Sequence, residues 1–65
     1  MFPPEPHWKV EIEYQINHVT FIETVLVCAE HPYHAWQTVQ RNIKRTKPRI
    51  SWLRLRGYMQ LGSQP

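Results

Sequence analysis

The chain has very little cysteine: Cys28 is the only one among its 65 residues. One cysteine cannot form a disulfide within the chain, which excludes the class of small disulfide-stapled secreted domains. Because Cys28 lies inside the apolar run 25–29, we expect a buried and inert thiol. With no disulfide framework and no signal-peptide pattern at residues 1–6, the chain is predicted to be cytoplasmic.

Long apolar runs and glycines are equally scarce. The longest apolar run, residues 25–29, is far shorter than the roughly 20 residues that a membrane-spanning helix needs, so no membrane association is expected. The two glycines, Gly57 and Gly62, do not form a glycine-rich phosphate loop.

Groups that could carry out catalysis are also few. The chain has no aspartate, and Glu11 and Glu13 have the spacing of a solvated strand face. His31 and His34 have a spacing that suits a metal, but no third ligand accompanies them, and we interpret them as surface histidines. The sequence therefore predicts a non-enzymatic protein that holds no metal or cofactor.

The clearest hydrophobic pattern in the chain lies in residues 8–16, where apolar and polar side chains alternate. This period of two predicts a strand with one buried face, formed by Trp8, Val10, Ile12, Tyr14 and Ile16. Asn17 and His18 form a plausible turn, because asparagine tolerates left-handed backbone conformations. Residues 19–29 are rich in β-branched and aromatic side chains and predict a second strand, whose second half is apolar on both faces.

A helix and a third strand are expected to follow. Pro32 suits the first position of a helix, and an apolar stripe continues through Ala35, Trp36, Val39 and Ile43. The helix should end near Arg45, before Pro48, and a strand with a bend at Gly57 should run from Ile50 to about Leu61. Residues 1–7 predict an extended proline-rich arm, residues 8–61 a single domain, and residues 62–65 a flexible tail.

These elements predict a small α+β domain of ββαβ order. The helical crossover would make the second and third strands parallel, and the first strand would be antiparallel to both if it lies between them. One sheet face would be covered by the helix, and nothing in the chain covers the other. Because a core this small gives marginal stability, we expect self-association, as a homodimer or higher oligomer that packs sheet faces together or joins sheet edges.

Charge is unevenly distributed along the chain. Residues 1–40 hold one lysine and five glutamates, a net charge of −4, whereas residues 41–65 hold seven cations and no acid, a net charge of +7. Clustered cations with interleaved aromatic residues are typical of surfaces that bind phosphate backbones and unpaired bases. The candidate nucleic-acid-binding residues are Arg41, Lys44, Arg45, Lys47, Arg49, Trp52, Arg54 and Arg56.

The third strand contributes four side chains with even spacing. On a regular strand Trp52, Arg54, Arg56 and Tyr58 would all lie on one sheet face. Arg54 and Arg56 have a competing structural explanation, because they could pair across strands with the glutamates of residues 8–16.

The last helical turns have a structural explanation as well. Arg41, Lys44 and Arg45 would favourably oppose the helix dipole there, which leaves Lys47 and Arg49 without an obvious structural task. The leading hypothesis is a non-enzymatic nucleic-acid-binding protein. The alternative is a protein-binding adaptor or inhibitor, or an oligomeric structural subunit, that docks on a larger complex through its aromatic and apolar sheet surface.

Overall fold

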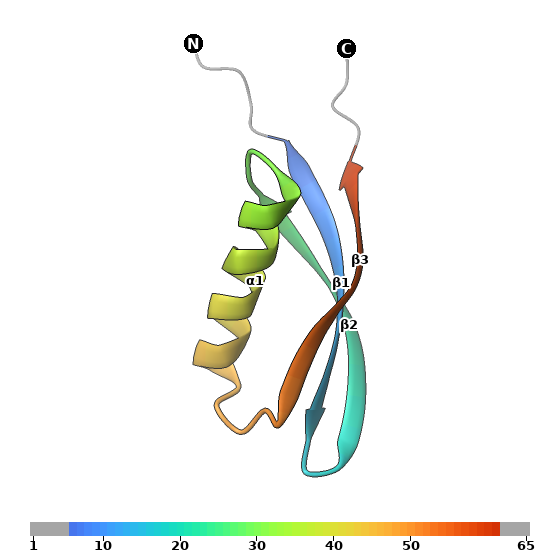
Figure 1. Cartoon of the computed structure of the whole chain (residues 1–65), viewed down its shortest axis with the longest axis vertical. Coiled ribbons are helices and arrows are strands. Elements are labelled where there is room, and N and C mark those ends of the chain that lie inside the picture. Colours follow the sequence, from blue (N-terminus) through green and yellow to red (C-terminus); the bar gives the residue numbers. More distant parts are fainter. Residues whose placement is uncertain (1–5, 62–65) are drawn as a thin grey trace.

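The structure, a computed structural model, describes residues 6–61. Its elements follow the predicted ββαβ order, and Figure 1 shows one helix beside a three-stranded sheet. They are strand β1 (His7–Ile16), strand β2 (Val19–Cys28), helix α1 (Pro32–Thr46) and strand β3 (Trp52–Leu61). The predicted α+β class is therefore confirmed. No helix within residues 6–61 has the length and apolar character needed to cross a membrane.

Element boundaries differ from the predicted ones by one or two residues. His7 was expected in the arm, but it opens β1, where its Cα partners are Cys28 and Leu61. Strand β3 begins at Trp52 rather than Ile50, because Ile50 N–H donates to the Lys47 carbonyl oxygen in a turn, at 3.3 Å. The rest of the predicted arm, except Pro6, and the whole predicted tail lie outside the described residues.

The turn between β1 and β2 is the predicted Asn17–His18 pair. Both residues have positive φ, 51° at Asn17 and 67° at His18. Positive φ at both central positions is the requirement of a type I′ turn, whose twist matches that of the strands it joins. The turn sets Ile16 opposite Val19 and thereby fixes the register of the whole hairpin.

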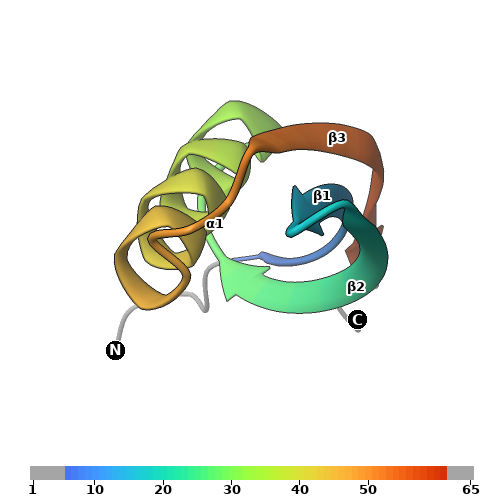
Figure 2. The ribbon, with the colours of Figure 1, turned by 90° about the horizontal axis from the view of Figure 1, so that it is seen from below.

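Strand β1 lies in the centre of the sheet, whose order is β2-β1-β3, and it is antiparallel to both neighbours. Figure 2 shows β2 and β3 curving around β1, with α1 beside the sheet. The face of the sheet toward α1 holds the core, which includes most of the predicted alternating residues of β1 and of the predicted stripe of α1; Ile16 and Trp36 are only partly buried against it. Its buried members are Trp8, Val10, Ile12, Tyr14, Val27, Ala29, Ala35, Val39 and Ile43.

A β-bulge interrupts the pairing of β3 with β1. Glu11 is opposite Gly57 and Ile12 is opposite Leu55, so Arg56 is the extra residue. An extra residue reverses the alternation of side chains beyond it. Tyr58 therefore lies on the core face, opposite Val10, with its ring 5.8 Å from the Trp8 ring. The prediction that Tyr58 shares a face with Trp52, Arg54 and Arg56 is wrong for this reason.

The sheet face away from α1, which we call the open face, is not covered by any element within residues 6–61. Leu26 lies on it and is 66% exposed. Cys28 lies on it as well, exposed and with Sγ 3.5 Å from His7 Nε2, so the prediction of a buried thiol is wrong. The apolar neighbours of Cys28 suggested burial, but Ala29 and Val27 point into the core and Cys28 points away from it.

Candidate nucleic-acid interface

Five of the predicted cations lie in the second half of α1 and in the turn that leads into β3. We call this group the basic end; it consists of Arg41, Lys44, Arg45, Lys47 and Arg49. All are exposed except Lys47, which is half-buried. Lys44 and Arg45 occupy the last turn of α1, where cations favourably oppose the negative end of the helix dipole.

Within residues 6–61, no carboxylate forms an ion pair with the basic end. Helix α1 contains no acidic residue, and within residues 6–61 none of the five cations has a carboxylate oxygen within 4.0 Å. Arg45 Nη2 donates to Asn42 Oδ1 at 3.4 Å. The asparagine side chain is uncharged, so this hydrogen bond does not cancel the charge of the Arg45 guanidinium. The basic end therefore presents positive charge to solvent.

A ring from β1 positions Lys47. The Lys47 Nζ lies 5.8 Å from the centroid of the Tyr14 ring, which is a cation–π distance. Tyr14 is held in turn by a hydrogen bond from its hydroxyl to Glu23 Oε1, at 2.9 Å, and by stacking on Phe21 at 5.3 Å. Burial, and then the contact with Glu23, raise the pKa of Tyr14, so its ring stays neutral. Lys47 is thus held near the sheet, where it is half-buried.

A shallow groove runs from the basic end to the start of β3. It is lined by Gln40, Lys44, Lys47, Pro48, Ile50, Ser51, Trp52 and Leu53. Trp52 is 37% exposed there, and the Arg54 guanidinium carbon lies 5.7 Å from its ring centroid. A partly exposed indole beside two lysines is a surface on which an unpaired base can stack while its phosphates meet cations. The sequence analysis missed Gln40, although its position one helical turn before Lys44 was visible.

The two arginines of β3 have different surroundings. They belong to a group that we call the ion-pair ladder: Glu11 and Glu13 of β1 with Arg54 and Arg56 of β3. Arg54 Nη2 lies 2.8 Å and Arg56 Nη1 lies 3.4 Å from Glu13 Oε1. Arg56 Nε lies 3.8 Å from Glu11 Oε1.

Glu13 is the centre of this ladder. Its side chain is only 13% exposed, and hydrogen bonding from Arg54, above all, lowers its pKa below the usual glutamate value. The structural explanation for Arg54 and Arg56 is therefore confirmed: their charge is paired within the fold, although Arg54 remains 66% exposed.

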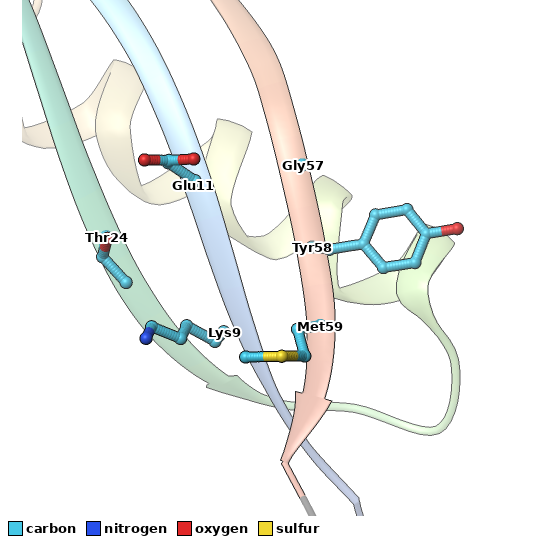
Figure 3. A pocket seen from close by; sticks show the side chains of 6 residues that line it. All are labelled: Lys9, Glu11, Thr24, Gly57, Tyr58 and Met59. Atoms are coloured by element: carbon cyan, nitrogen blue, oxygen red, sulfur yellow. The ribbon is translucent and has the colours of Figure 1, made fainter.

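A second indentation lies on the open face and is seen in Figure 3. Lys9, Glu11, Thr24 and Met59 surround Gly57, and Figure 3 shows the Tyr58 ring directed away from them, across β3. The hollow exists because Gly57 has no side chain; a Cβ there would meet nothing within 4 Å. We assign no chemistry to this shallow hollow.

The histidines form no larger cluster. The rings of His31 and His34 stack with centroids 4.0 Å apart at the start of α1. Across the part of the chain that the structure describes, no three His, Cys, Asp or Glu side chains are close enough together to hold a metal ion. The candidate site therefore consists of the basic end and Trp52. Comparison with protein-family models, with curated proteins and with solved structures finds no match for this chain.

Proposed function

We propose that the chain is a small, non-enzymatic, cytoplasmic nucleic-acid-binding protein that contacts the phosphate backbone through its basic end. One observation carries the proposal: five cations within nine residues of sequence, in the second half of α1 and the turn after it, have no carboxylate partner within residues 6–61. Fixed, unpaired cations bind a phosphate backbone by releasing its condensed counterions. Trp52, at the rim of the same groove, adds a stacking surface for an unpaired base.

The proposal predicts a strong dependence on salt. If all five cations of the basic end contact phosphates, the logarithm of the affinity for duplex DNA should fall with the logarithm of the salt concentration with a slope of about −4 to −5. For a single strand the slope should be about −3 to −4. Arg54 and Arg56 should add little to either value, because binding a phosphate would require them to leave Glu13.

Two double variants test the assignment at equal loss of charge. Lys47→Gln with Arg49→Gln removes two charges from the basic end, and Arg54→Gln with Arg56→Gln removes two from the ion-pair ladder. We expect the first variant to bind a short labelled duplex and a short single strand on the order of tenfold more weakly, with a shallower salt slope. The second should lose less than about threefold. Fluorescence anisotropy over a salt series measures both quantities.

Equal losses in the two variants would show that binding follows net charge only and would overturn the assignment to the basic end. No binding by the unaltered chain at low salt would overturn the proposed function itself. Circular dichroism of each variant confirms that its fold is retained, which matters most for the second variant because it leaves Glu13 without its arginine partners.

The alternative function, a protein-binding adaptor, inhibitor or oligomeric subunit, rests on a different observation. Large apolar side chains on the open face are more than half exposed, namely Ile22, Leu26 and Met59. Binding through them would persist at high salt, because apolar contacts do not depend on counterion release.

A further inference from the structure

The two outer strands of the sheet differ in how well their edges are protected against another strand. Strand β3 carries a bulge at Arg56, a glycine and two arginines, which are features that discourage strand addition. Strand β2 is ten residues long and regular, and it contains no proline, glycine, lysine or arginine. Its single charged residue is Glu23. The edge of β2 is therefore the one that is suited to pair with a further strand.

The hairpin register shows which backbone groups of β2 point outward. Ile16 and Val19 close the two-residue turn, and Ala29 N–H donates to the Pro6 carbonyl oxygen at 3.1 Å. Because hydrogen bonding alternates along an antiparallel pair, the odd-numbered residues of β2 bond to β1. The N–H and C=O groups of Thr20, Ile22, Thr24 and Leu26 are thus directed to the outer edge, where the sheet order places no further strand of residues 6–61.

The side chains of the same residues are suited to a strand pair. Ile22 and Leu26 are 57% and 66% exposed on the open face, on either side of Thr24. In Figure 1 the lower half of β2, next to the hairpin turn, lies on the far side of the sheet from α1. An arriving strand would therefore meet both outward backbone groups and uncovered apolar side chains.

We propose that this edge pairs with the β2 edge of a second copy of the chain, antiparallel, to form a continuous six-stranded sheet. A two-fold axis normal to the sheet relates the copies, so the open faces of both lie on the same side. Residues that are opposite each other must then lie on the same face of the sheet. Because side chains alternate between the two faces along β2, an even-numbered residue must be opposite an even-numbered one, and an odd-numbered residue opposite an odd-numbered one.

Charge selects the register. Centring the pair on Glu23 would set two like charges directly opposite each other, which is destabilising. Centring it on Thr24 gives an overlap of nine residues, from Thr20 to Cys28, without that clash. In this register Ile22 of each copy lies opposite Leu26 of the other, so the two most exposed apolar side chains of the edge cover each other. The outward backbone groups of the even-numbered residues also meet as hydrogen-bonded pairs.

Disulfide trapping tests the register. In a Cys28→Ser background, Thr24→Cys places two thiols opposite each other at a Cα separation of about 5.5 Å, which a disulfide spans. We expect a covalent dimer after mild oxidation. The matched control is Ile22→Cys in the same background: its two copies would lie four residues apart along the strands, about 13 Å, beyond the reach of a disulfide. Equal trapping of both variants, or of neither, would overturn the register.

Loss of the outward donor tests the edge itself. Thr24→Pro removes an N–H that points away from β1, so the hairpin should keep its own hydrogen bonds. Thr24→Val keeps the N–H and is the matched control. In light scattering over a concentration series, we expect the unaltered chain and Thr24→Val to be dimers and Thr24→Pro to be a monomer with an unchanged circular dichroism spectrum. A monomeric unaltered chain, or a dimeric Thr24→Pro variant, would overturn the proposal. Neither result bears on the basic end, whose nucleic-acid binding is measured separately.

Discussion

Seven lysines and arginines follow residue 40, and the fold divides them into two groups with different surroundings. Two belong to the ion-pair ladder, where a largely buried glutamate side chain of β1 accepts hydrogen bonds from both arginines. The other five form the basic end, which has no carboxylate within 4.0 Å among residues 6–61. The positive charge that a ligand can use is therefore set by the position of the acids more than by the number of cations.

The difference arises from register and composition. Antiparallel pairing sets Arg54 opposite Glu13, and the bulge leaves Arg56 beside the same carboxylate. Helix α1 has no acid in any of its turns, so no residue of its own can pair with the cations of its last turn. A variant that removes the carboxylate from the ladder should make its arginines available, and one that adds a carboxylate to the basic end should neutralise part of its charge. The first of these changes should have the larger effect.

The largest change is expected when the ladder loses its central carboxylate. Glu13→Gln removes the negative charge that pairs with Arg54 and with Arg56 Nη1, so both arginines become more available to phosphates. Affinity for a short duplex at low salt should rise about five- to tenfold, and the salt slope should steepen by about one to two. Glu23→Gln is the matched control, because it changes net charge equally but frees no cation; Tyr14 can still donate to its amide oxygen. An equal rise in both variants would show that net charge accounts for the effect.

A smaller change is expected when a carboxylate is added to the basic end. Gln40 lines the groove with Lys44 and Lys47 and lies one helical turn before Lys44. Gln40→Glu should form an i,i+4 ion pair with Lys44 and weaken duplex binding about threefold, with a salt slope shallower by about one. Gln60→Glu, near the far end of β3, is the control of equal charge. If the two variants weaken binding equally, the groove is not the binding surface.

Much of the fold was predictable, because local pattern and topology agree. The alternation in residues 8–16, the Asn17–His18 turn and the α1 stripe each occur where the sequence indicates. The pairing of Arg54 and Arg56 with Glu11 and Glu13 could also be anticipated from strand register.

The errors arise where the sequence does not fix side-chain direction, even though Gly57 indicated a bend in the third strand. Apolar and polar side chains alternate regularly in the sequence before the bulge at Arg56. Only the pairing of β3 with β1 shows that the bulge places Tyr58 on the core face. Cys28 has apolar neighbours on both sides, so composition could not distinguish the core face from the open face. The groove was not predicted because it joins a helix end to a strand start through the turn at residues 47–51.

The smallest expected effect concerns the pH dependence of stability, and it isolates the ladder from ligand binding. Hydrogen bonding from Arg54 lowers the pKa of Glu13 in the folded chain, so the unfolded chain binds more protons as the pH falls through the usual glutamate range. The contribution of the ladder is complete above that range and is lost as the pH falls through the lowered pKa. Glu13→Gln should therefore flatten the fall in urea midpoint between about pH 6 and pH 3, and Arg54→Gln should flatten it similarly, since it removes the principal cause of the lowered pKa. The effect should shrink with added salt, because Arg54 is largely exposed. A profile in Arg54→Gln as steep as that of the unaltered chain would show that this ion pair does not contribute to stability.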